Sequence, residues 1–160
     1  MTREPDMRMI RRWQFCWAVW LIGLVGAGAV AGPGSYPSAV IILVVTAGGG
    51  WLLSPGFFPR SITASEAARL SAADGRPIVY WRPGCQFCLR LRFRLGRRAR
   101  NLSWVDIWSD PAGAAEVRSH ADGNETVPTV IIDGQPYVNP DPGWLREWVP
   151  TGGRPGGRPR

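Results

Sequence analysis

Lysine is absent from this sequence, because all nineteen basic residues are arginine. Schiff-base chemistry and the lysine of a phosphate-binding loop are therefore excluded. Histidine occurs once, at His120, which excludes zinc sites built from several histidines. Cysteine occurs three times, which is too few for a secreted domain held together by disulfides. A chain of 160 residues has room for one globular domain and an additional segment, at ~100–200 residues per domain.

Charge is absent from two stretches near the N-terminus, residues 13–31 and 36–53. Since ~20 apolar residues cross a bilayer, we expect two transmembrane helices there, preceded by a cytoplasmic segment at residues 1–12. Arginines lie before the first stretch and after the second, so the positive-inside rule predicts a cell-membrane protein whose following domain is cytoplasmic. A signal peptide cleaved after Ala31 is the alternative interpretation.

The rest of the chain reads as one small domain, residues 61–150, with a Gly-, Pro- and Arg-rich tail at residues 151–160 that is predicted to be disordered. A capping box at Thr63 predicts a first helix that stops before Gly75. The elements expected after it are strand 77–81, helix 85–98, strand 102–107, helix 110–120, strands 129–132 and 136–138, and helix 142–148. Apart from the first helix, the predicted order is βαβαββα, an α/β arrangement.

One segment of this domain carries two conflicting patterns. Residues 89–95 alternate apolar side chains with arginine, which is typical of a strand. Cys88, Leu91 and Leu95 nevertheless share one face at helical spacing. Because two parallel strands need a crossover between them, we interpret the segment as a helix.

A CxxC motif, Cys85-Gln-Phe-Cys88, follows a predicted strand and opens the next helix. Unpaired backbone N–H groups and the helix dipole favour a thiolate at that position, and Arg82 lies three residues before it. We therefore expect Cys85 to be the nucleophile and Cys88 a less exposed resolving thiol. A closed zinc site needs four ligands, and only Cys16 and His120 remain, so no metal site is expected. An iron–sulfur cluster shared between two subunits stays open as an alternative.

A second motif, Thr126-Val127-Pro128, directly precedes a predicted strand. Proline at a strand start marks an edge, a bend or a cis peptide bond. A cis bond would leave the Val127 backbone free to pair with an extended thiol or peptide.

The segments Tyr80-Trp-Arg-Pro-Gly-Cys85-Gln-Phe-Cys88 and Glu125-Thr-Val-Pro-Thr129, followed by Asn139-Pro140, resemble glutaredoxins, and most of all the actinobacterial mycoredoxins. The resemblance covers about residues 76–149. It implies a thioredoxin-like domain with a mixed four-stranded sheet, no bound cofactor, and reduction of protein mixed disulfides with a small thiol. The site residues that it implies are catalytic Cys85 and Cys88, thiolate-stabilising Arg82, and substrate-binding Phe87, Thr126, Val127, cis Pro128 and Asn139.

The segment Val138-Asn-Pro-Asp141 departs from the family, since glutaredoxins carry Gly-Gly and an acidic residue where the glutathione carboxylate docks. We therefore expect a mycothiol-like thiol as co-substrate. The alternative functions are an outward-facing thiol-disulfide oxidant or isomerase, and a non-enzymatic iron–sulfur cluster carrier. The arginines between Arg90 and Arg100 are interpreted as a solvated face or as a contact with an anionic lipid bilayer, and nucleic acid is not the expected partner.

Overall fold

The computed structural model describes residues 4–32, 34, 36–52 and 54–149. The predicted disordered tail, residues 151–160, lies outside these described residues. The chain divides into two compact units, Met1–Phe57 and Phe58–Arg160, and each is described by itself. The second unit therefore starts three residues before the predicted domain boundary at residue 61.

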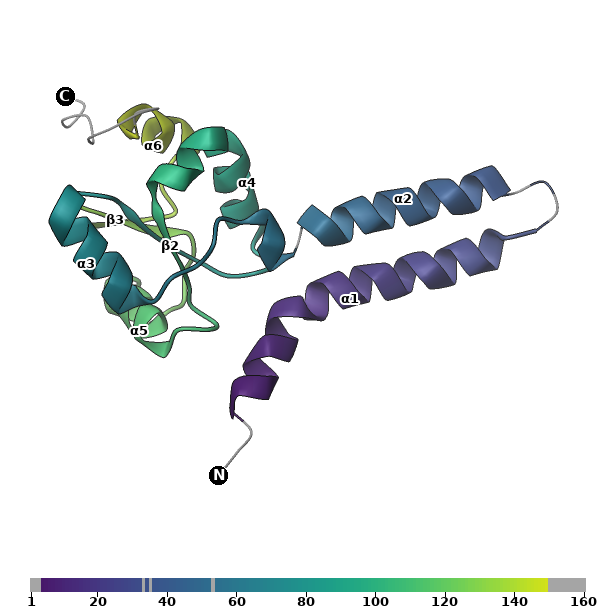
Figure 1. Ribbon diagram of the computed structural model, residues 1–160, viewed down its shortest axis with the longest axis horizontal. Coiled ribbons are helices and arrows are strands. Elements are labelled where there is room, and N and C mark those ends of the chain that lie inside the picture. Colours follow the sequence, from purple (N-terminus) through teal and green to yellow (C-terminus); the bar gives the residue numbers. More distant parts are fainter. Residues whose placement is uncertain (1–3, 33, 35, 53, 150–160) are drawn as a thin grey trace. The chain divides into compact units, whose positions relative to one another are not determined.

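The first unit is a helical hairpin. Its helices α1 (Glu4–Val30) and α2 (Tyr36–Leu52) lie side by side, and a short 3-10 helix, η1 (Pro55–Phe57), follows them (Figure 1). Glycine permits a close approach of the two helices, because a Cβ added at Gly23 would overlap the side chain of Thr46. A Cβ added at Gly50 would overlap Trp20 in the same way.

The predicted membrane spans at residues 13–31 and 36–53 are wrong. Within the part of the chain that the structure describes, no helix combines the length and the apolar character that a membrane crossing requires. The helix α2 has 17 residues, against ~20 for a typical span. The predicted cell-membrane location of a two-span protein is overturned with them.

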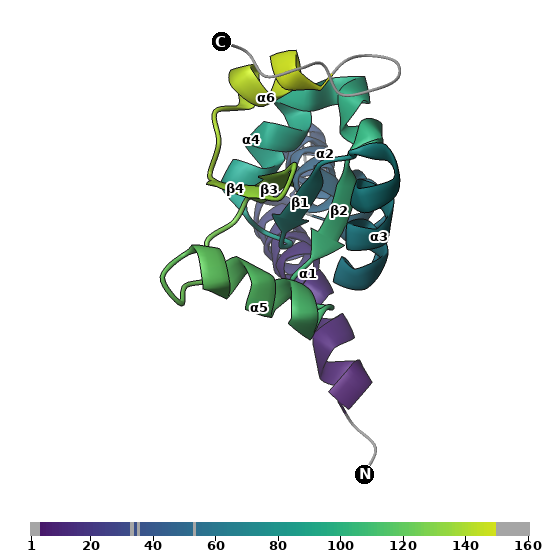
Figure 2. The same cartoon turned by 90° about the vertical axis from the view of Figure 1, so that its left-hand side faces the viewer.

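The second unit has the predicted alternation of helices and strands. Its elements are α3 (Ala64–Asp74), β1 (Ile78–Trp81), α4 (Gln86–Leu95), the 3-10 helix η2 (Gly96–Asn101), β2 (Ser103–Asp106), α5 (Pro111–His120), β3 (Thr129–Ile132), β4 (Gln135–Val138) and α6 (Pro142–Trp148). The strands form one mixed sheet in the order β2-β1-β3-β4, in which only β1 and β2 are parallel. Helix α4 packs against α6 and α3 against α5, and the two pairs cover opposite sides of the sheet (Figures 1 and 2). The expected mixed four-stranded sheet is confirmed.

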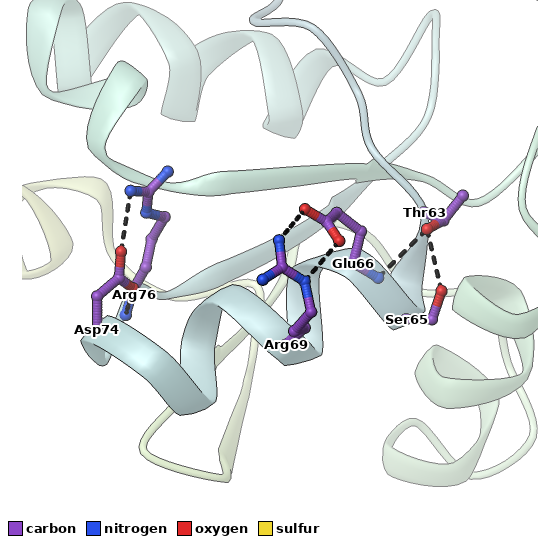
Figure 3. Close-up of polar contacts among 6 residues, drawn as sticks. All are labelled: Thr63, Ser65, Glu66, Arg69, Asp74 and Arg76. Carbon is purple, nitrogen blue, oxygen red and sulfur yellow. Dashed lines mark hydrogen bonds and ion pairs between the residues drawn. The ribbon is translucent and has the colours of Figure 1, made fainter.

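Helix α3 begins and ends where its capping residues predict. The Thr63 hydroxyl accepts a hydrogen bond from the Glu66 backbone N–H at 3.2 Å, and Gly75 closes the helix with a φ of 71°. Exposed ion pairs join Glu66 to Arg69 along the helix and Asp74 to Arg76 at its end (Figure 3).

Helix α4 forms despite the alternating pattern of its sequence, and the interpretation of residues 89–95 as a helix is confirmed. Cys88, Leu91 and Leu95 form its buried face. It ends at Leu95 rather than at the predicted residue 98, because Gly96 has a φ of 55° and its N–H bonds to carbonyls of the last turn.

An aromatic cluster supports the end of β1 that leads to the CxxC motif. Phe58 stacks on Trp81 with 3.9 Å between ring centroids, and Trp104 on β2 meets both rings edge-on. Trp81 is fully buried, and its indole N–H donates to the Ser61 hydroxyl at 3.0 Å. The segment before α3 is thus part of the core that fixes the last residue of β1.

Candidate active site

Cys85 lies at the junction between β1 and α4. The chain leaves β1 at Trp81 and turns at Gly84, whose φ of 77° suits glycine. Cys85 then takes the extended conformation of an N-cap residue, and its Sγ accepts a hydrogen bond from the Cys88 backbone N–H at 3.2 Å. This capping bond points an otherwise unpaired helix N–H at the sulfur, which favours negative charge there.

The surroundings of Cys85 lower the pKa of its thiol to about 7. The largest cause is the hydrogen bond from the Cys88 thiol, and the backbone N–H groups of Cys88 and Phe87 and the charge of Arg82 act in the same direction. These effects outweigh burial, which raises the pKa. A substantial fraction of Cys85 is therefore in the thiolate form, the nucleophilic form of cysteine, near neutral pH.

Cys88 has the opposite character. Its side chain is fully buried, and burial together with the neighbouring Cys85 raises the pKa of its thiol far above the ordinary range. Cys88 therefore stays protonated and donates to Cys85. Both cysteines are free thiols in this structure.

The segment before β3 faces the sulfur. The Val127–Pro128 peptide bond is cis, as the sequence resemblance implies. The Cys85 thiol donates to the Val127 carbonyl at 3.4 Å. The Pro128 carbonyl accepts from the Asn139 backbone N–H at 2.8 Å, so the residue that follows β4 is tied to the start of β3.

An open groove of about 700 Å³ joins these segments. Its lining residues are Arg82, Gly84, Cys85, Gln86, Phe87, Asn124, Glu125, Thr126, Val127 and Asn139. Every predicted site residue lines the groove except Cys88 and Pro128, which are buried. Sequence reasoning did not assign Gly84, Gln86, Asn124 or Glu125 to the site, although each lies within two residues of a motif or inside the CxxC.

The groove carries little net charge. The Arg82 guanidinium lies over the ring of Trp108, 5.9 Å from its centroid, which holds the cation beside the groove. Glu125 forms an ion pair with Arg118 at 2.7 Å. The remaining polar groups are amides and one hydroxyl, which suit a ligand that binds by neutral hydrogen bonds.

The described residues contain no group of three or more histidine, cysteine, aspartate and glutamate side chains that could hold a metal ion. His120 contacts Glu116 on its own helix at 3.1 Å. Cys16, the third cysteine, belongs to the other unit.

A mixed four-stranded sheet with helices on both sides, and a CxxC motif at a helix start facing a cis-proline segment, fit the thioredoxin-like class of thiol–disulfide oxidoreductases. Within that class, residues 78–137 match the family model of the glutaredoxins, which supports a glutaredoxin domain in the second unit. The match includes both cysteines of the motif and Pro128, and it stops before Asn139. No curated protein and no solved structure matches the chain significantly.

Proposed function

We propose that this chain is a mycoredoxin-like enzyme that reduces mixed disulfides between proteins and a low-molecular-weight thiol. The observation that carries the proposal is the difference between the two thiols. Cys85 lines an open groove and has a pKa lowered to about 7, whereas Cys88 is buried and protonated. One sulfur is thus available for attack, and the other stabilises it.

The reaction needs only thiols as co-reactants. The Cys85 thiolate attacks the small-thiol sulfur of a protein mixed disulfide, so the protein leaves as a thiolate and Cys85 is joined to the small thiol. A second molecule of the small thiol, as its thiolate, then attacks that bond. It regenerates the Cys85 thiolate and leaves with the first small thiol as a symmetrical disulfide. Cys88 remains reduced throughout this route.

The lining of the groove favours a small thiol without carboxylates at its ends. Arg82 is the one cationic side chain among the lining residues, and it lies beside Cys85 at the reacting end. Asn139, which also lines the groove, contributes a neutral amide and no charge that could pair with a carboxylate of the thiol. A mycothiol-like co-substrate, which binds through hydroxyl and amide groups, fits this lining better than glutathione does.

Turnover of two mixed-disulfide substrates tests the proposal. One protein should be prepared as a mixed disulfide with mycothiol and, separately, with glutathione, and each offered with its own thiol as reductant. We expect higher kcat/KM with mycothiol, and no turnover by Cys85→Ser with either. Cys88→Ser should keep most of its activity on the mixed disulfide. If Cys88→Ser loses mixed-disulfide turnover as completely as it loses reduction of a protein disulfide, the enzyme is a dithiol reductase and the proposed route is wrong.

A further inference from the structure

The exposed face of α4 carries a row of arginines that starts at the active-site groove. Phe87, Arg90 and Arg94 follow one another at helical spacing on α4, and Arg97 comes next along the chain in η2, after the turn at Gly96. All four side chains are exposed, and Phe87 also lines the groove. We name Arg90, Arg94 and Arg97 the arginine stripe. From Phe87 to Arg94 the row on α4 is ~10 Å long at 1.5 Å per residue.

Among the residues that the structure describes, no carboxylate neutralises the charge of the stripe. Residues 86–101 contain no aspartate or glutamate. Across residues 4–149, as far as they are described, no stripe arginine takes part in an ion pair. Three arginines elsewhere in the unit, Arg69, Arg76 and Arg118, are each paired with a carboxylate.

Helix stability does not account for the stripe. A cation near a helix C-terminus interacts favourably with the dipole, which covers Arg94 in the last turn of α4. Arg90 and Arg94, however, are four residues apart on one face, and like charges at that spacing destabilise a helix. The arrangement is therefore better explained by a partner that neutralises it.

We propose that the arginine stripe binds an acidic protein segment that flanks the substrate disulfide and so selects which protein mixed disulfides reach Cys85. This inference rests on the proposed function, in which the substrate is a protein mixed disulfide. Because Phe87 lines the same groove as Cys85, a protein whose sulfur contacts Cys85 can reach past Phe87 to the stripe. A segment of ~3 extended residues covers the ~10 Å of the row on α4, and carboxylates in it meet unpaired guanidinium groups. Such complementarity raises association rates and suppresses partners of the wrong charge.

Two peptides of equal length test this selection. Each carries one cysteine in a mixed disulfide with the same small thiol, flanked by four glutamates in one peptide and by four glutamines in the other. With the full chain at low salt, we expect kcat/KM to be about tenfold higher for the acidic peptide, through the on-rate. Raising the salt to ~0.5 M should bring the two values together, because exposed charges are screened.

A matched pair of triple variants tests whether the preference for the acidic peptide depends on the stripe. The first variant should lose the preference for the acidic peptide and keep its turnover of the glutamine peptide; it combines Arg90→Gln, Arg94→Gln and Arg97→Gln. Arg60→Gln with Arg69→Gln and Arg76→Gln removes the same net charge elsewhere on the unit, and should retain the preference. Binding of both peptides to Cys85→Ser, measured by fluorescence anisotropy, should show the same order without any turnover.

Three results would overturn the inference: equal kcat/KM for both peptides, an equal loss in the two triple variants, or binding of a short duplex DNA that is tighter than the acidic peptide and depends on the stripe. The last would identify the stripe as a nucleic-acid surface. Failure of the proposed function is distinguishable, because neither peptide would then be turned over. The anisotropy measurement would still show whether the stripe binds the acidic peptide more tightly than the glutamine peptide.

Discussion

At Cys85, the hydrogen bond from the Cys88 thiol is expected to control the pKa more strongly than any other single group. Titration by thiolate absorbance should give a midpoint near 7 for the native chain, and the alkylation rate should rise with pH through the same midpoint, since only the thiolate reacts. Cys88→Ala removes the donating thiol and keeps the backbone N–H, so it should raise the pKa toward ~8.5. Cys16→Ala is the control and should leave the midpoint unchanged.

Arg82 contributes to the same pKa through its charge, and its contribution is the smallest of the lowering causes. Arg82→Gln should therefore raise the Cys85 pKa by less than Cys88→Ala does. Arg118→Gln removes an arginine that is already paired with Glu125, and should have no effect on the titration. A shift in Arg82→Gln as large as that in Cys88→Ala would contradict this order of causes.

Among the helices, α3 and α5 share one capping carboxylate. Asp110 accepts hydrogen bonds from Ala112 and Gly113 at the start of α5, and also from the Ala64 backbone N–H at 2.6 Å at the start of α3. Asp110→Ala leaves donors of two helices unpaired and should cost about 2–3 kcal/mol in the free energy of unfolding. Asp141→Ala, which removes a single bond to Trp144 at the start of α6, should cost about 1 kcal/mol. Urea denaturation of the two variants compares them, and equal losses would mean that the bond to Ala64 contributes nothing.

Local signals predicted most elements of the second unit, and what they missed depends on parts of the chain outside the local pattern. The Thr63 cap and the Gly75 stop each act within one helical turn, so both ends of α3 were predictable. Gly96 could also continue a helix, and the positive φ that ends α4 there depends on the chain that follows. The second bond of Asp110 joins residues 46 apart, which no spacing rule reveals. At the site, the two motifs predicted the reacting segments, whereas Gln86, Asn124 and Glu125 join the groove only because tertiary packing brings the motifs together.

For the whole molecule, the two adjacent residues Phe57 and Phe58 lie on opposite sides of the boundary between the units. Phe58 is buried against Trp81 and Trp104, whereas Phe57 contacts Trp51 of the hairpin. Phe58→Ala should lower the stability of the second unit by about 3–5 kcal/mol, through the cavity that it leaves. Phe57→Ala should leave that unit unchanged. Thermal unfolding followed at the near-ultraviolet signal of the buried tryptophans measures both.

The same boundary predicts which fragment retains the fold. A chain that begins at Phe58 keeps the aromatic cluster and should match the full chain in melting temperature and mixed-disulfide turnover. A chain that begins at Ser61 loses Phe58 and should unfold at a lower temperature, even though it contains every residue of the site. Equal melting temperatures for the two fragments would show that Phe58 is not part of the stabilising core.

The bond from the Cys85 thiol to the Val127 carbonyl exists only while Cys85 carries its proton. When the proton leaves, the sulfur becomes an acceptor alone, and the Val127 carbonyl loses that donor. A backbone N–H of an incoming protein can then take the vacated position, beside the sulfur that has just become able to attack. A single ionisation therefore makes Cys85 nucleophilic and also frees the Val127 carbonyl to accept a hydrogen bond from the substrate. The protonated form of Cys85 is both less reactive and less open to substrate.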